Sequence, residues 1–378
     1  MRQIIISNSY TNENIEIIIS YVKKLVSKFK IDNIIINGNV LGYNEIKKDY
    51  GLNYDQKLFM ENLNKEEILK KIAPNSCSSI IEIINAYKNG DYIDDQKKQE
   101  LGHGVTNYIE ERYDYLIKVL EEFSKIKKTF YNLGKYESPF NNYLLRELSF
   151  FLDVDYTWLK KTILYAKFRD IYQNFKNKLN SLESNRFRYI GGKPIIEKGY
   201  ILAGIPCFNP NSVPTDRSSE LQENITKDLI SAIKRHFSYS KKLIFYNTTK
   251  GRLSRNPFSF KPGSASIRRF IKEVNNKLSR KIFVQSYYNW VTTHFYKKDD
   301  FIFLLNNSAS NNALFNILEI SRKINCYDVD PNLEKIRKLN LYDSYLADYS
   351  NGPERLALNY KNPDQVINER NIEGCYYM

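Results

Sequence analysis

Residues 34–43 read IIINGNVLGY, a run of three isoleucines that stops at Gly38 and an amide, Asn39. A short β-branched run that ends at a glycine is typical of a buried strand entering a tight turn. Residues 2–7, RQIIIS, form a second run of this kind. Residues 14–30, NIEIIISYVKKLVSKFK, lie between these two runs, and their apolar residues recur at helical spacing. A strand, a helix and a strand within about 40 residues predict a βαβ unit with a parallel sheet.

The predicted helix over residues 14–30 carries a single apolar stripe with lysines on the opposite side. We expect this stripe to face the sheet. Its members are Ile15, Ile18, Ile19, Val22, Leu25, Val26 and Phe29.

The rest of the chain alternates helical and strand-rich stretches. Residues 54–127 and 139–185 are predicted to be mainly helical, and the run TFYNLGKYES between them predicts a short strand. Gly191-Gly192 separates two short β runs in the manner of a hairpin. Three later runs, KKLIFYN, RKIFVQS and DDFIFLL, predict further strands that end in polar turns. From Cys326 onward no long apolar segment follows, so residues 326–378 are expected to form a docked or flexible extension.

Composition limits the class of protein. The 378 residues suffice for a large core, and the four scattered cysteines form no CxxC pair, so they indicate neither a zinc site nor a disulfide framework. No apolar stretch is long enough to cross a membrane, and no signal peptide is evident. We expect a cytoplasmic protein. The net charge of +14 favours polyanionic partners, although the abundance of Lys, Asn, Ile and Tyr also fits A/T-rich codons.

The order of strands and turns resembles that of the calcineurin-like metallophosphoesterases. That family carries D-x-H, G-D, G-N-H-[DE], a lone histidine and G-H-x-H after successive strands. Here IIISNSY, INGN, LGKYES, LIFYNTTKG and FVQSYYNW stand in those places. The resemblance covers about residues 1–325 and implies an α/β fold of two β-sheets packed as a sandwich and flanked by helices. The helical insertions would then fall at about 54–127 and 139–185, and residues 326–378 would form a C-terminal extension.

The positions that the resemblance assigns to the metal site hold other residue types: Asn8, Tyr10, Asn39, Lys135, Tyr136, Tyr246, Tyr287 and Asn289. A dinuclear centre needs carboxylates and neutral imidazoles to offset the charge of its cations. Amides and phenols do not offset that charge, and Lys135 would add to it. We therefore expect no metal, no cofactor and no catalytic residue at this site.

The chain contains three histidines, His103, His236 and His294, and none falls at a ligand position of the resembled family. His294 lies just beyond the last degenerate motif. An active phosphodiesterase or nuclease with a shifted site, using His294 with Asp299 or Glu137, is the alternative reading.

Positive charge concentrates between Lys241 and Lys281, where twelve basic residues face a single acid, Glu273. Within residues 250–269, KGRLSRNPFSFKPGSASIRR, two phenylalanines, Phe258 and Phe260, lie beside basic residues, Arg252, Arg255 and Lys261. This pattern suits phosphates and unpaired bases. The alternative is a solvated basic face. In the resembled fold the segment would emerge on the rim of the former active site. The candidate polyanion-binding residues are Lys250, Arg252, Arg255, Lys261, Arg268, Arg269, Lys272, Arg280 and Lys281.

These observations predict a pseudoenzyme that acts as a binding or structural subunit. Nucleic acid or a ribonucleoprotein is the expected partner, and no membrane is. A third reading is a protein-interaction scaffold, in which the former cleft accepts a peptide through its aromatic residues, Tyr10, Tyr136, Tyr287 and Tyr288.

Overall fold

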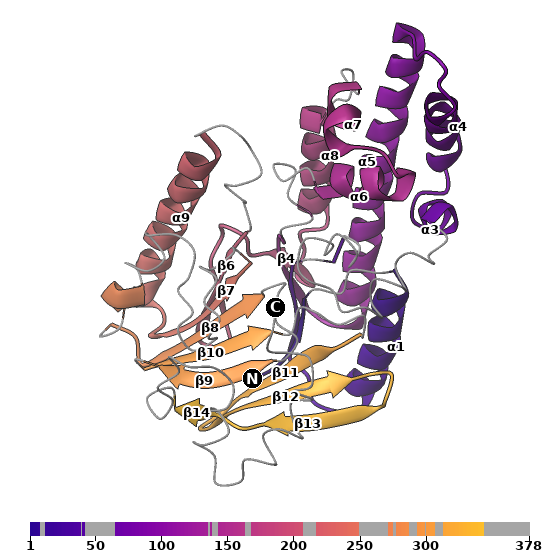
Figure 1. The fold of residues 1–378 in the computed structure, drawn as a ribbon. Helices are drawn as coiled ribbons and strands as arrows, with labels where there is room; N and C mark the ends of the chain where they lie inside the picture. Colours follow the sequence, from indigo (N-terminus) through magenta and orange to yellow (C-terminus); the bar gives the residue numbers. More distant parts are fainter. Residues whose placement is uncertain are drawn as a thin grey trace, which may run out of the picture.

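Two mixed β-sheets packed face to face form the centre of the molecule, with helices on both outer faces (Figure 1). The predicted class, an α/β fold of two sheets flanked by helices, is confirmed. The computed structural model describes residues 1–7, 12–38, 40–41, 65–134, 137, 143–162, 168–206, 217–248, 271–274, 277–286, 293–298, 300–306 and 313–343.

The first sheet combines parallel and antiparallel strands. Strands β1 to β4 run parallel to their neighbours, whereas β11, β12 and β13 add antiparallel strands beyond β1. The predicted βαβ unit is present, with Ile4 paired to Ile34 across β1 and β2. In spatial order the strands are β13 (Lys335–Leu339), β12 (Ile324–Asp330), β11 (Phe315–Ile320), β1 (Arg2–Ile6), β2 (Asn33–Asn37), β3 (Thr129–Asn132) and β4 (Phe187–Tyr189).

The second sheet has a parallel centre and antiparallel additions. Strands β6, β7, β8 and β10 run parallel, while β5 and β9 pair antiparallel at either side. In spatial order the strands are β14 (Tyr342–Asp343), β9 (His294–Lys298), β10 (Phe301–Asn306), β8 (Arg280–Ser286), β7 (Lys242–Asn247), β6 (Tyr200–Ile205) and β5 (Ile195–Glu197).

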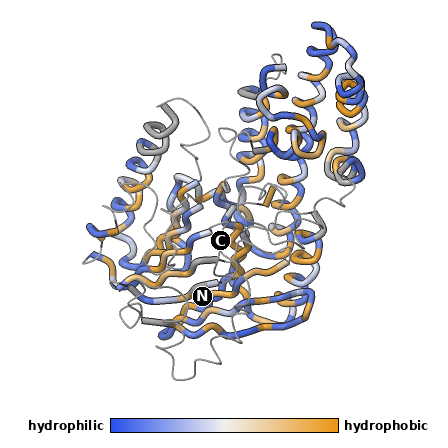
Figure 2. The backbone as a smooth tube through the Cα atoms, viewed as in Figure 1, coloured by the Kyte–Doolittle hydropathy of each residue, from blue (hydrophilic) through white to orange (hydrophobic). Residues whose placement is uncertain are grey.

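Side-chain alternation divides the core into three layers. In β2, Ile34 and Ile36 face the helices, whereas Ile35 faces the second sheet. Phe245 of β7 packs toward the helix on its own side, and Ile244 packs between the sheets. Figure 2 shows the resulting concentration of hydrophobic residues along the strands. Each isoleucine buried in this way contributes roughly 1.5–3 kcal/mol of transfer free energy.

Helices cover the two outer faces unequally. On the first sheet lie α1 (Asn12–Lys28) and the lower part of α5 (Asp95–Ile126), and on the second lies α9 (Arg217–Arg235), followed by the short η3 (His236–Ser238) (Figure 1). The stripe predicted on α1 is buried through Leu25, but Phe29 is 44% exposed because the helix ends at Lys28.

The two helical insertions form one group that rises beyond the first sheet (Figure 1). The long α5 begins with Asp94 as its N-cap, whose carboxylate accepts from the Lys97 backbone N–H at 2.8 Å. Within residues 139–185, predicted to be mainly helical, the described residues form α6, α7 and α8. The group contains α3 (Lys65–Ile72), α4 (Cys77–Lys88), α5, α6 (Tyr143–Leu152), α7 (Tyr156–Thr162) and α8 (Phe168–Ser181).

The predicted hairpin at Gly191-Gly192 is wrong. Strands β4 and β5 on either side of it belong to different sheets, so these glycines lie where the chain crosses between the sheets. The hairpin lies instead at Lys198-Gly199, between β5 and β6, where both residues have positive φ, 51° and 75°. A two-residue turn with positive φ at both positions matches the twist of paired strands.

The expected boundary at residue 325 is also displaced. Cys326 lies inside β12, and β13 and β14 follow it within the two sheets. Neither β12 nor β13 contains a long apolar run, because an antiparallel strand near a sheet edge needs only one buried face. In β12 the buried residues are separated by half-buried ones, and the residues of β13 are mostly exposed. The folded unit therefore extends at least to Asp343.

A buried ion pair joins the helices of the insertion. Arg112 of α5 and Glu147 of α6 are almost completely inaccessible, and Nε lies 3.2 Å from Oε1. The Tyr108 hydroxyl donates to the same Oε1 at 2.6 Å. Burial opposes the charge of Arg112, but the adjacent Glu147 carboxylate raises the pKa of the guanidinium overall. Arg112 Nη1 and Glu147 Oε2 have no hydrogen-bond partner among the described residues.

Breaking this ion pair from one side should cost more than removing it. Glu147→Leu leaves a buried guanidinium without its carboxylate and is expected to lower the free energy of unfolding by about 3–5 kcal/mol. Adding Arg112→Met should restore most of that loss, since no buried charge remains. Urea unfolding of both variants checks this. A double variant as unstable as the single one would contradict it.

Acid should weaken the pairing of β1 with β11. Arg2 Nη2 lies 2.5 Å from Glu319 Oε1, and this hydrogen bond lowers the pKa of Glu319 below its ordinary 4.5 against the opposing effect of burial. The stabilisation that results is fully present above the pKa of the unfolded state. It is lost as the pH falls through the lowered pKa of the folded state. Glu319→Gln should therefore be less stable than the parent near neutral pH, with a gap that closes below about pH 4. A gap that is independent of pH in thermal unfolding would contradict this account.

Candidate functional site: the amide cluster at the carboxyl edges of the sheets

The parallel strands of both sheets end at one common edge of the molecule. β2 and β3 end in Asn37 and Asn132, and β8 ends in Ser286. Each of these residues comes two positions after a residue that packs between the sheets, namely Ile35, Phe130 or Val284, and therefore shares its face of the strand. The three polar side chains therefore lie at the margin of the space between the sheets. Carboxyl edges of parallel strands are where α/β proteins place their binding sites.

These side chains hydrogen-bond to one another across the sheets. Asn37 Nδ2 donates to Ser286 Oγ at 2.7 Å, and Asn132 Nδ2 donates to Asn37 Oδ1 at 3.0 Å and to the Ile205 carbonyl at 3.1 Å. All three side chains are buried. We call Asn37, Asn132 and Ser286 the amide cluster. It ties the first sheet to β6 and β8 of the second.

Thr248 adds a further link just after β7. Its buried hydroxyl lies 2.8 Å from the carbonyl oxygen of Leu133 and 3.1 Å from that of Ile205. On the outer face of the second sheet, Asn247 Nδ2 donates to Gln285 Oε1 at 2.6 Å. The amide and hydroxyl side chains of the amide cluster, Thr248, Asn247 and Gln285 are neutral. They can hydrogen-bond backbone segments to one another, but they offer no proton acceptor for general base catalysis.

Glycines allow the backbones to meet at this edge. Gly38 has a φ of 72°, and a Cβ built on it would lie 2.3 Å from the Cα of Gly134 and 2.9 Å from Cγ2 of Thr248. A side chain at residue 38 would thus collide with the turn after β3. The glycine that ends the run quoted first is required by contact between the two turns as well as by its own conformation.

Glu137 is the one carboxylate described at this edge. It is fully buried and accepts hydrogen bonds from the backbone N–H groups of Val40 and Leu41, the latter at 2.9 Å. The Tyr113 hydroxyl of α5 donates to the Glu137 carbonyl at 2.9 Å. Glu137 therefore fastens the turn after β2 to the turn after β3 and to the insertion. The alternative reading had assigned this residue to a shifted catalytic site.

Most positions predicted from the resemblance lie outside the described residues. This holds for Asn8, Tyr10, Asn39, Lys135, Tyr136, Tyr287 and Asn289, and for Tyr288 and Asp299. Tyr246 is described and lies in the core between the sheets, where its hydroxyl donates to Gln3 Oε1 at 2.8 Å. Burial raises its pKa well above the ordinary value of 10.0.

Two predicted polyanion-binding residues lie away from the carboxyl edge. Arg280 and Lys281 begin β8, and Ser286 ends it, so six residues of extended chain, about 20 Å, separate them from the amide cluster. These two residues therefore lie at the opposite end of β8 from the amide cluster, and residues 250–269, expected on the rim of the former active site, lie outside the described residues. Lys272 is described and exposed. The other candidates, Lys250, Arg252, Arg255, Lys261, Arg268 and Arg269, lie outside the described residues.

The histidines do not gather. His103 is exposed on α5, and a ring nitrogen of His236 lies 2.8 Å from the Ala232 carbonyl oxygen. His294 begins β9, and its side chain is outside the described set. Within the described ranges no group of three or more His, Cys, Asp or Glu residues is placed to hold a metal ion. In the same ranges no helix has the length and apolar composition to cross a bilayer.

Comparison with known proteins gives distant likenesses in structure alone. No protein-family model and no curated protein matches the chain. One crystal structure, 14% identical, covers 90% of this chain and 98% of its own at a TM-score of 0.39. GAP50, described as the anchor in the inner membrane complex of Plasmodium, is 9% identical, with coverages of 90% and 88% and a TM-score of 0.43. A candidate 5′-nucleotidase from Staphylococcus aureus, solved with alpha-ketoglutarate, is 9% identical, with coverages of 95% and 57% and a TM-score of 0.37. Likenesses this distant assign neither a family nor a function.

Sequence reasoning missed the amide cluster although a signal was present. The strands NIIIN, TFYN and RKIFVQS each finish an apolar run with a polar residue on the inward face. The metal-ligand positions of the resembled family fall after these strand ends, so the resemblance did not point to the cluster.

Removing the central amide should loosen the carboxyl edge. Asn132→Ala deletes a buried donor to Asn37 Oδ1 and to the Ile205 carbonyl, which keeps the Thr248 hydroxyl as a donor, and is expected to cost roughly 1–3 kcal/mol of unfolding free energy. The matched control is Asn174→Ala on the exposed face of α8, expected to stay within about 0.5 kcal/mol of the parent. Equal losses in both variants, measured by urea unfolding, would contradict the role given to Asn132.

Proposed function

We propose that this chain is a catalytically inactive protein of metallophosphoesterase-like fold that acts as a binding or structural subunit. Its partner is nucleic acid or a ribonucleoprotein, contacted through the basic segment 250–281. The observation that supports this most is the amide cluster. The three side chains of this cluster, at the edge where such a fold would work, are neutral and hydrogen-bonded to one another.

The residues at the former metal positions do not fit a dinuclear cation site. Amides and phenols leave the charge of two cations unbalanced, and Lys135 adds a further positive charge. Glu137 is engaged with two backbone N–H groups. We derive no hydrolytic step through a metal at this edge.

The distribution of charge supports a polyanionic partner. Arginine, favoured in the basic segment, presents a planar set of donors that matches a phosphate group. Phosphate contacts supply most of the affinity in binding that is not sequence-specific, and they make it dependent on salt. A scaffold that binds a peptide would not require that dependence.

The inactive state is tested by metal content and by turnover. After incubation with manganese, zinc and iron, the purified protein should contain no stoichiometric metal and should not hydrolyse a phosphodiester such as bis(p-nitrophenyl) phosphate. One or two metals per chain with measurable hydrolysis would instead favour the active phosphoesterase.

The partner is tested by charge reversal. Changing Arg252, Arg255, Arg268 and Arg269 to Glu should weaken binding of a single-stranded oligonucleotide by about tenfold or more and make its salt dependence shallower. The matched control makes the same change in charge on exposed lysines elsewhere, at Lys160, Lys176, Lys227 and Lys335. Equal binding by the parent and the arginine variant would exclude this segment as the contact surface. Binding to protein with no salt-dependent oligonucleotide binding would favour the scaffold.

A further inference from the structure

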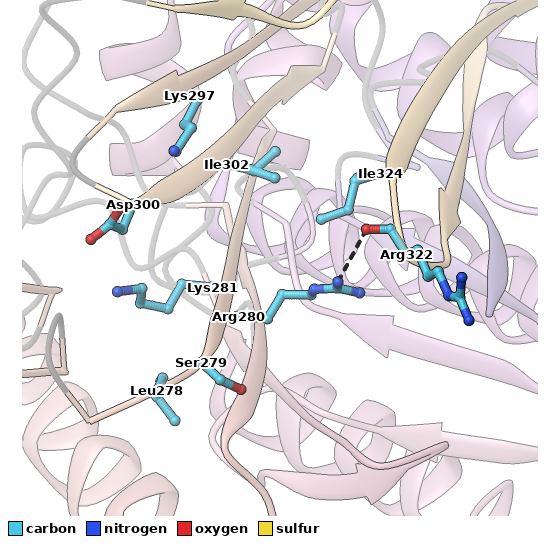
Figure 3. A pocket seen from close by; sticks show the side chains of 9 residues that line it. All are labelled: Leu278, Ser279, Arg280, Lys281, Lys297, Asp300, Ile302, Arg322 and Ile324. Atoms are coloured by element: carbon cyan, nitrogen blue, oxygen red, sulfur yellow. Dashed lines mark hydrogen bonds between the residues drawn. The ribbon is translucent and has the colours of Figure 1, made fainter.

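A basic pocket of about 470 Å³ lies at the amino edge of the sheets, opposite the amide cluster (Figure 3). Its walls come from the starts of β8 and β10, the end of β9 and the turn between β11 and β12. Both sheets therefore contribute to it. The volume falls within the range of sites for small molecules.

Among the described residues, four cationic side chains and one carboxylate line this pocket. Arg280, Lys281, Lys297 and Arg322 supply the positive charge, and Asp300 supplies the negative one. Figure 3 shows Lys281 beside Asp300 and Lys297 beside Ile302. The surplus of cations favours an anionic ligand.

Arg280 is held in place by neutral partners. Its Nη1 lies 2.9 Å from the Tyr200 hydroxyl and 2.5 Å from the Ser321 carbonyl oxygen, and its Nη2 lies 3.4 Å from the carbonyl oxygen of Arg322. These contacts orient the guanidinium without neutralising it. A positioned cation loses little side-chain entropy when an anion arrives.

Lys281 contributes a charge that is already largely removed from water. Its side chain is 4% exposed, and its ammonium lies 5.4 Å from the centre of the Phe301 ring. Burial lowers its pKa from the ordinary 10.5, against the opposing effect of Asp300. Lys281 pairs with Phe301 of β10, whose ring packs on the α9 side, so this ammonium lies on the opposite face of the sheet from Ile302.

The pocket also has an apolar wall. Ile302 and Ile324 line it, and both pack at the margin of the core between the sheets. Lys297 pairs directly with Ile302 across β9 and β10, which brings an ammonium beside this wall. A ligand that fits must combine an anionic group with a less polar body.

We propose that this pocket binds a phosphate monoester of nucleotide size, with the phosphate near Arg280 and Lys297 and the organic part against Ile302 and Ile324. Such a group occurs in a free nucleotide and at the end of a nucleic acid chain. The pocket shares Arg280 and Lys281 with the basic segment 250–281, but its test differs from that of the proposed function because it measures dependence on a terminal phosphate.

Calorimetric titration of the full chain tests the pocket with adenosine 5′-monophosphate, adenosine and a short RNA with or without a 5′-phosphate. The monophosphate or the 5′-phosphorylated RNA should bind about tenfold or more tightly than its counterpart without phosphate. Preference for the monophosphate identifies a free nucleotide, and preference for the phosphorylated RNA identifies a chain end. Absence of both preferences overturns the proposal, whereas loss of binding to the RNA without phosphate affects only the proposed function.

Two variants localise the binding. Lys297→Glu with Arg322→Glu changes exposed residues and should weaken the phosphate-dependent binding by about tenfold or more. Lys176→Glu with Lys227→Glu makes the same change in charge on α8 and α9 and should leave it unchanged. Equal binding by the pocket variant and the parent, or equal loss in the control, would place the ligand elsewhere.

Discussion

The side-chain amide of Asn132 holds the carboxyl edges of the two sheets together. It donates both to Asn37 in its own sheet and to a carbonyl of β6 in the other. The two turns behind it approach so closely that Gly38 and Gly134 leave no room for a side chain. The loops that follow β2 and β3 therefore begin from fixed points. Neutral hydrogen bonds fix these points.

The sequence predicted the elements better than their connections. Apolar runs located β1, β2, β3, β7, β8 and β10, because a buried strand must be apolar on its inward face. The crossing at Gly191-Gly192 was taken for a hairpin because glycines serve both purposes, and the hairpin at Lys198-Gly199 had a weaker signal. Strands β12 and β13 were missed because an edge strand with one exposed face lacks an apolar run.

The candidate site was predictable in place but not in composition. The predicted strand order indicated the edge where the carboxyl ends of the parallel strands meet, and the amide cluster lies at that edge. The sequence could not show that Tyr246 points into the core, since a one-residue shift reverses the face of a strand residue. Nor could it show that Arg280 and the turn near Ser321, 41 residues apart, share one wall of a pocket.

The sheets are joined at both ends of their shared interface. Asn37 bonds to Ser286 at one edge, and Arg280 bonds to the Ser321 carbonyl at the other. Between them Tyr246 and Gln3 bridge the apolar interior. Neither sheet can separate from the other without exposing buried polar groups along the whole interface. The two sheets should consequently unfold as one cooperative unit, and local opening should be confined to the helical insertion and the outer strands.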